Sequence, residues 1–178
     1  PGVSLGYRRF GLLPHPLQIA EGCKVRDKIL NALNDATDIV FSHFHGDHVP
    51  LLDANPYQLS IGSLPPQFNE LRCWSKSGDG LSSRMRKRFL DLSDMSGSNL
   101  QLAEGRTEGA LSFSESVPHG ELNSRLGSLM MTRIETDGGV FVHASDIQLL
   151  HAPTVERVID WQPDIILAAG PPLYLDQL

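Results

Sequence analysis

With 178 residues the chain is long enough to form one domain with a buried core, and 40% of its residues are hydrophobic, as in ordinary globular proteins. No apolar run approaches the roughly 18 residues of a membrane-spanning helix, and no signal-peptide pattern stands at the start. The net charge of −6 argues weakly against a general nucleic-acid binder, and two cysteines are too few for a disulfide framework. We therefore expect a single cytoplasmic domain over residues 1–178.

The first predicted elements are a loop, a helix and a strand. Residues 1–20 are rich in glycine and proline and are typical of an irregular loop, in which we expect His15 to lie at the surface rather than to bind a metal. Residues 21–36 place apolar side chains on one helical stripe, which predicts an amphipathic helix that covers a sheet. The run Ile39-Val40-Phe41 then predicts a short buried strand.

Four residues of metal-binding type follow this strand directly, namely His43, His45, Asp47 and His48. Residues i and i+2 of an extended chain project to the same side, so His43 and His45 can reach one cation while Phe44 points away into packing. The glycine that follows lets the chain turn, which brings Asp47 and His48 toward a second position. Imidazole and carboxylate ligands suit zinc, with iron or manganese as alternatives. The cluster therefore predicts two metal ions, and the competing interpretation is an exposed polar loop.

The middle of the chain is the least regular part. We expect residues 49–63 to form a loop beside the metal residues and residues 64–99 to form an irregular insertion or lid, because prolines and glycines recur there. Within it, residues 82–92 predict a helix with the cationic side chains Arg84, Arg86, Lys87 and Arg88. These side chains either contact phosphate groups near the metals or form a solvated helix face. The solvated face is the favoured interpretation, since aspartates share the segment.

From residue 100 onward the pattern predicts strands. Short alternating runs lead to Pro118-His119-Gly120, so His119 stands at a strand end, in the layer of loops where the first histidines also lie. Two longer strands are separated by Asp137-Gly138-Gly139, which is typical of a hairpin turn. The second of them leads to Asp146, a carboxylate that is costly beside a buried strand unless it is paired or binds a metal.

The last predicted elements are a helix over residues 154–161 and a fully buried strand over residues 164–170. Strand, helix and strand in this order predict a parallel βαβ unit. His151 stands just before the helix, and we do not expect it to replace an absent metal ligand. Composition and periodicity together support an α/β class.

One motif resembles a known family. His43-Phe44-His45-Gly46-Asp47-His48 is similar to the His-x-His-x-Asp-His signature of the metallo-β-lactamase fold superfamily of metallohydrolases. His143-Ala-Ser-Asp-Ile-Gln-Leu-Leu and Gly170-Pro-Pro-Leu-Tyr-Leu resemble an uncharacterised, mainly archaeal branch of metal-dependent hydrolases within it. The resemblance implies an αββα sandwich, in which two mixed sheets pack face to face with helices outside. It also implies a partial domain, incomplete at both ends, that lacks a last metal-binding histidine.

The same resemblance implies a hydrolase with a dinuclear zinc site. The ligands that it implies are His43, His45 and His119 for one zinc, Asp47 and His48 for the second, and Asp146 as the bridge between them. A water shared by the two ions would attack an ester, lactone, thioester or phosphodiester in a small-molecule substrate. Asp47 would orient that water and shuttle its proton.

Three other functions stay open at the level of the sequence. A nucleic-acid phosphodiesterase would use the cluster from Arg84 to Arg88 to contact the backbone of its substrate. A redox iron enzyme would use an overlapping set of ligands. A non-catalytic interaction protein would keep the metal only to stabilise its fold. Of these, the nuclease is the nearest alternative to the hydrolase.

Overall fold

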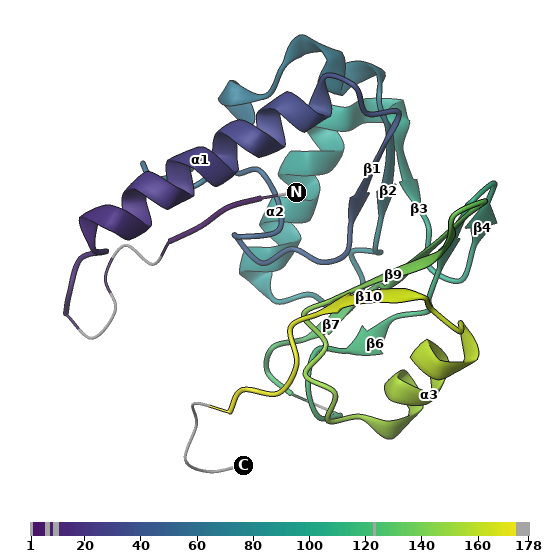
Figure 1. Cartoon of the computed structure of the whole chain (residues 1–178). Helices are drawn as coiled ribbons and strands as arrows, with labels where there is room; N and C mark the ends of the chain where they lie inside the picture. The colour runs from purple at the N-terminus through teal and green to yellow at the C-terminus, as the bar shows by residue number, and fades with distance from the viewer. Residues whose placement is uncertain (1, 6–7, 9–10, 123, 174–178) are drawn as a thin grey trace. The chain divides into compact units, whose positions relative to one another are not determined.

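The computed structural model of the chain describes residues 2–5, 8, 11–122 and 124–173, so Tyr174 and Leu175 of the last quoted motif lie outside the described residues. Helices and strands occur together, which confirms the α/β class (Figure 1). The chain divides into two compact units, Pro1–Gln101 and Leu102–Leu178. In the part of the chain that is described, no helix has both the length and the apolar character needed to cross a membrane.

The first unit contains a three-stranded sheet and two long helices. Its elements are α1 (Pro16–Leu33), β1 (Asp38–Phe41), η1 (Ile61–Ser63), η2 (Pro66–Glu70), β2 (Arg72–Ser75), α2 (Ser83–Ser96), η3 (Gly97–Asn99) and β3 (Leu100–Leu102). The strand order is β1-β2-β3, and β1 and β2 run parallel with Ile39 opposite Cys73. Strand β2 lies inside the stretch expected to be irregular. Its four residues show no alternation, so only the pairing with β1 reveals it.

Helix α1 begins at Pro16, inside the segment for which the sequence predicts a loop. The reason is its N-terminal cap. The Nδ1 atom of His15 accepts a hydrogen bond from the backbone N–H of Leu17 (3.2 Å), and the Oε1 atom of Gln18 accepts one from the backbone N–H of His15 (3.0 Å). Pro16 occupies the first turn, where its missing N–H costs nothing. His15 is therefore a helix cap.

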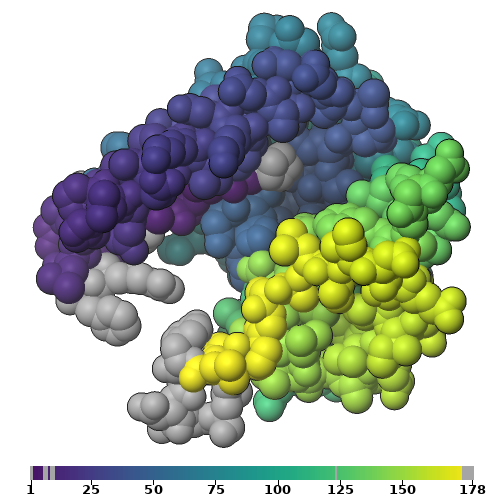
Figure 2. Space-filling model, in the orientation of Figure 1, coloured from purple at the N-terminus to yellow at the C-terminus, as the bar shows by residue number. Residues whose placement is uncertain are grey.

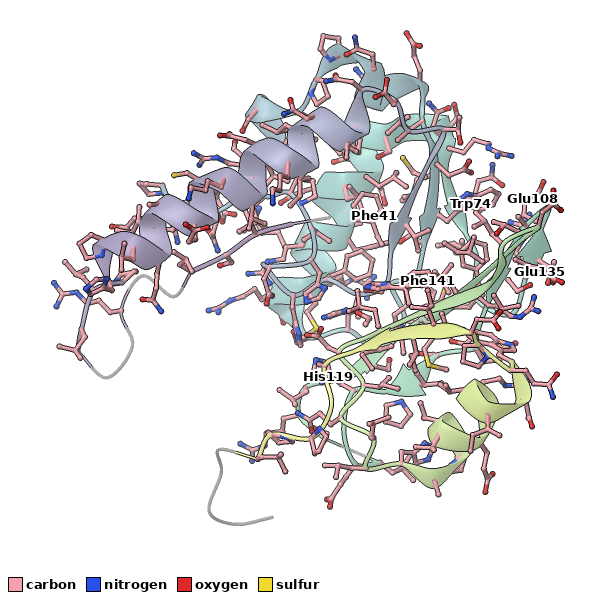
Figure 3. All side chains as sticks on the ribbon, viewed as in Figure 1. Phe41, Trp74, Glu108, His119, Glu135 and Phe141 are labelled. Atoms are coloured by element: carbon pink, nitrogen blue, oxygen red, sulfur yellow. The ribbon has the colours of Figure 1, made fainter. Side chains whose placement is uncertain are left out.

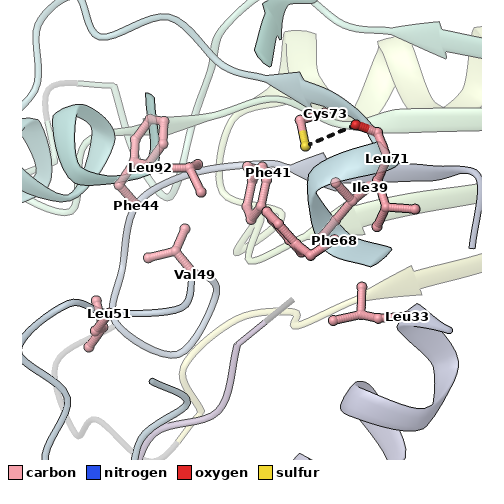
Figure 4. Close-up of a cluster of buried hydrophobic side chains, with 10 residues drawn as sticks. All are labelled: Leu33, Ile39, Phe41, Phe44, Val49, Leu51, Phe68, Leu71, Cys73 and Leu92. Carbon is pink, nitrogen blue, oxygen red and sulfur yellow. Dashed lines mark hydrogen bonds between the residues drawn. The ribbon is translucent and has the colours of Figure 1, made fainter. Parts of the chain in front are cut away.

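Both helices cover the same face of the first sheet (Figure 1). Ile39 and Phe41 alternate onto this face, where they meet Leu33 from α1 and Leu92 from α2. The whole cluster is drawn in Figure 4 and consists of Leu33, Ile39, Phe41, Phe44, Val49, Leu51, Phe68, Leu71, Cys73 and Leu92. Because Phe44 and Val49 belong to it, the segment after β1 is anchored in the core of the unit.

On the other face of the sheet, the carboxylate of Asp38 joins β1 to β2. The Nε1 atom of Trp74 donates to Oδ1 (2.7 Å), while Arg72 Nη2 (2.9 Å) and Thr37 Oγ1 (2.8 Å) donate to Oδ2. Burial raises the pKa of Asp38, but the hydrogen bonds from these three residues and the charge of Arg72 lower it more, so the pKa lies below its ordinary value. The folded state therefore favours the charged carboxylate.

We expect Asp38→Asn to lower the free energy of unfolding near pH 7 by about 1–3 kcal/mol, because charge-assisted hydrogen bonds are lost. Since the folded-state pKa of Asp38 is below the unfolded-state pKa, its contribution is present above the unfolded-state pKa and is lost as the pH falls through the folded-state value. Urea unfolding of wild type and variant between about pH 7 and pH 2 measures this. A difference that stays constant over the range would contradict it, and Asp35→Asn, at an exposed position, is the control.

The second unit is built on a five-stranded sheet. Its elements are β4 (Thr107–Glu108), β5 (Leu111–Phe113), β6 (Val117–Pro118), β7 (Ser128–Leu129), β8 (Thr132–Thr136), β9 (Gly139–Ser145), α3 (Ala152–Asp160) and β10 (Ile165–Ala168). The order is β10-β9-β8-β5-β4, with β6 and β7 as a separate pair. The predicted hairpin is confirmed, since β8 and β9 pair antiparallel and Thr136 lies opposite Gly139. The predicted βαβ unit is also confirmed, since β9 and β10 pair in parallel around α3.

Strand β10 lies where the sequence predicts it, but the prediction that it is fully buried is wrong. Ile165, Ile166 and Leu167 are exposed by 63%, 44% and 57%, and the strand, yellow in Figure 2, lies at the surface. Successive side chains of a strand point to opposite faces, so the exposure of three in a row means that both faces of β10, the edge strand, are largely uncovered in the described residues. A continuous apolar run does not distinguish an edge strand from a central one, because the neighbours decide the burial.

Candidate metal-binding residues

The first candidate pair is His43 and His45, in the loop that follows β1. The Nε2 atom of His43 lies 3.1 Å from Nδ1 of His45, and the two rings meet edge to face with 4.6 Å between centroids. Two nitrogens bound to one zinc at about 2.05 Å would lie about 3.3 Å apart at a tetrahedral angle. The distance between the two nitrogens is therefore close to that of two ligands of one zinc ion. The two side chains lie on the same side of the chain, as the i, i+2 spacing predicts.

A hydroxyl group sets the orientation of His43. Ser42 Oγ lies 3.0 Å from the Nδ1 atom of His43, so the other ring nitrogen is the one that faces His45. Histidine ligands of metals commonly hold their second nitrogen in this way. Sequence reasoning missed Ser42, although a hydroxyl residue directly before the histidine motif is a signal that could have suggested it.

Asp47 and His48 form a second pair in the same loop. The backbone N–H of His48 donates to the carbonyl of His45 (3.0 Å), which closes the turn that Gly46 permits. The imidazole of His48 consequently lies against that of His43, with 4.1 Å between ring centroids, and its Nε2 atom is 3.7 Å from Asp47 Oδ2. The side chain of Asp47 is 54% exposed. The four predicted residues of the first unit are thus gathered in one loop.

This loop, residues 43–48, is fixed by the surrounding fold. Phe44 is fully buried and meets Phe89 of α2 edge to face at 5.3 Å, which confirms that its side chain points into the core. The guanidinium of Arg88 donates to the Phe44 carbonyl (3.0 Å). Gly2 lies against the far end of the loop, where a Cβ atom would stand 2.5 Å from Val49 N. Contacts from α2 and from Gly2 therefore hold this loop in place.

The second unit supplies His119 and Asp146. His119 follows β6 and is labelled in Figure 3, and its Nε2 atom lies 3.4 Å from Oδ2 of Asp146, which follows β9. Gln148 donates its backbone N–H to the His119 carbonyl (2.9 Å), which ties the two strand ends together. Ser145 has a φ of +54°, a left-handed conformation that ends the strand and turns the chain. The nitrogen–oxygen distance again fits two ligands of one ion.

The six predicted ligands thus form three close pairs, two in the first unit and one in the second. The other two candidate histidines stand at helix starts instead. His15 caps α1, and His151 precedes α3 with its Nδ1 atom 2.8 Å from Thr154 Oγ1. His15 thus caps a helix where the sequence predicts a loop, and neither histidine belongs to the three close pairs.

Comparison with known proteins gives a consistent result over nearly the whole chain. The chain is similar to proteins named UPF0282. It is 45% identical over 178 residues to the UPF0282 protein of Methanosarcina mazei, which covers 98% of this chain and 57% of that protein. It is 33% identical over 184 residues to the UPF0282 protein of Thermococcus gammatolerans, covering 98% of this chain and 61% of that protein. The chain thus spans about 60% of the length of these curated relatives.

These names correct the family resemblance drawn from the sequence. The relatives are named UPF0282 proteins, and no link to the metallo-β-lactamase fold superfamily accompanies the match, so that assignment is wrong. No family model matches the chain. No solved structure matches it either. The physical reason for the error is that a six-residue ligand motif reports local geometry, which unrelated folds can share.

Proposed function

We propose that this chain is a metal-dependent hydrolase whose metal ligands come from both units. The observation that carries the proposal is the spacing within the pairs, 3.1 Å for His43 and His45 and 3.4 Å for His119 and Asp146. A tetrahedral zinc site needs three or four protein ligands, and each pair offers two. Neither pair has enough ligands for a zinc site by itself, but the two pairs together would have enough if they bound the same ion.

In this proposal the first zinc is held by His43, His45 and His119, the second by Asp47 and His48, and Asp146 bridges them. The proposal includes a layered fold in which two mixed sheets pack face to face with helices outside, because loops at the strand ends of both units would then meet at one edge. The ligand set consists of imidazoles and carboxylates, which suits zinc and leaves iron and manganese as alternatives.

When bound, zinc would lower the pKa of a water toward neutrality and polarise the bond to be cleaved. The chain's own groups would do the rest. Asp47 is exposed beside His48, so its carboxylate can accept the proton of the attacking water and pass it on. Ser42 would hold His43 in one orientation throughout the reaction. Substrates with an ester, lactone, thioester or phosphodiester bond suit this arrangement.

Elemental analysis of protein purified without chelator tests the proposal. We expect about two zinc ions per chain in the wild type and a loss of at least one in His45→Ala, because the close imidazole pair is broken. His15→Ala is the matched control, since its imidazole caps a helix and should leave the metal content unchanged. Equal metal content in all three proteins, or none in the wild type, would contradict the proposal.

A further inference from the structure

A cationic pocket lies in the first unit beside the 43–48 loop. It has a volume of about 280 Å³, and its lining residues are Leu51, Asp53, Gln58, Arg84, Lys87 and Arg88. Three cations thus line it against one carboxylate, all within one compact unit. Its volume is close to the lower end of the range, about 300–1,000 Å³, that is usual for small-molecule sites. The pocket is therefore large enough for one small anionic group.

Two of the three cations of this pocket, Lys87 and Arg88, are held by other residues of the unit. Lys87 donates to Asp91 Oδ2 at 2.6 Å, and this hydrogen bond and the negative charge of Asp91 keep the pKa of Lys87 above its ordinary value. Burial, followed by the positive charge of Arg84, lowers the pKa of Arg88. Arg88 nevertheless stays charged, because a guanidinium remains protonated in proteins. Like charges are thus packed together, and an anion bound between them would relieve their repulsion.

Two lining residues also touch the loop of histidines. The Nη1 atom of Arg88 donates to the Phe44 carbonyl at 3.0 Å. A Cβ atom built on Gly46 would lie 3.1 Å from Nη2 of Arg88 and 3.4 Å from Nε2 of Gln58. The side chains of Arg88 and Gln58 therefore line the pocket and also lie against the 43–48 loop. Any side chain larger than glycine at position 46 would press on this wall.

We propose that this pocket binds the phosphate group of a small phosphorylated substrate and so positions the rest of that substrate over the 43–48 loop. Guanidinium groups match phosphate oxygens in a bidentate way, and the lysine adds a point charge. Lys87 is paired with Asp91, so the net positive charge comes from Arg84 and Arg88 against Asp53, and the two guanidinium groups suit an anionic group with several acceptor oxygens. The positioning rests on the proposed hydrolase function, whereas phosphate binding itself does not.

The geometry favours a small molecule over a nucleic acid. Arg86 lies on the same helix between Arg84 and Lys87, but it does not line the pocket. The cationic side chains therefore converge on one concave site. A nucleic-acid backbone would instead need contacts at several phosphates along a track.

Titration calorimetry tests this inference. Metal is first removed from the protein with a chelator, and the binding of inorganic phosphate is then measured. We expect Arg84→Gln to weaken phosphate binding about tenfold, because a charge-assisted hydrogen bond is lost. Arg86→Gln is the matched control, since it removes the same charge from the same helix outside the pocket and should change the affinity less than about twofold. Asp53→Asn should have the opposite effect and tighten binding severalfold, because the only carboxylate of the pocket loses its charge.

Each outcome separates this inference from the proposed function. Phosphate binding without metal, with the expected order of the three variants, supports the pocket even if elemental analysis finds no zinc. Binding that needs zinc and ignores Arg84→Gln would mean that phosphate contacts the ion, and it would overturn the inference. Equal weakening by Arg84→Gln and Arg86→Gln, together with salt-dependent binding of a single-stranded oligonucleotide, would overturn it in favour of a nucleic-acid surface.

Discussion

Phe44→Ala is expected to lower the free energy of unfolding by about 3–5 kcal/mol, the range for removing a large buried aromatic side chain. Phe44 is fully buried in the core of the first unit, and its ring contacts that of Phe89 at 5.3 Å. The substitution removes this contact and leaves a cavity beneath the loop. Urea unfolding near neutral pH measures the change, and part of it should be recovered in Phe44→Leu, which refills much of the volume.

The same substitution is expected to affect metal binding as well as stability. Phe44 lies between His43 and His45, so loss of its anchor should loosen the spacing of their nitrogens and weaken zinc binding as well. Leu52→Ala is the control, because this leucine is 64% exposed and its removal should change stability by less than about 0.5 kcal/mol. An equal effect of Phe44→Ala and Leu52→Ala would show that the loop is not anchored in the core.

Binding of the zinc ion assigned to His43, His45 and His119 is expected to raise the free energy of unfolding by about 2.7 kcal/mol when the free zinc concentration is one hundred times the dissociation constant of that site. This follows from the proposed function, because an ion that binds only the folded chain stabilises it by mass action. Thermal unfolding with zinc and with chelator measures the gain. His43→Ala and His119→Ala should each abolish most of it, although the two residues belong to different units.

The pair of variants decides whether both units hold the same ion. If His119→Ala kept the full gain while His43→Ala lost it, the second unit would not supply a ligand. His15→Ala again serves as the control, and it should lose about 1 kcal/mol of stability in the metal-free protein because a helix cap is removed. The gain from zinc should nevertheless be the same in this variant as in the wild type.

The local parts of this protein follow from its sequence. The strand before the histidines, the hairpin around Asp137-Gly138 and the parallel pairing of β9 and β10 are all formed by signals within a few residues or by one short crossover. Candidate ligands such as His119 and Asp146 could be located because each follows a strand end. The motif at His43 also indicated the direction of Phe44, since neighbouring residues of an extended chain alternate.

Other features depended on contacts that no local pattern contains. Strand β2 exists because it pairs with β1, and β10 is exposed because both faces of this edge strand are largely uncovered in the described residues. The short histidine motif could not identify the family, because the spacing of ligands depends on coordination geometry and not on ancestry.

By itself, the sequence determined which residues carry metal-binding chemistry and where along the chain they stand, because ligand type and strand ends are local properties. The tertiary structure decided which distant side chains join them. Arg88 lies 44 residues from Phe44 and still donates a hydrogen bond to its carbonyl, while Gln58, which also lines the pocket, lies close to Gly46. Packing of α2 on the first core fixes these contacts, and such packing depends on shape and volume across the whole unit rather than on any run of residues.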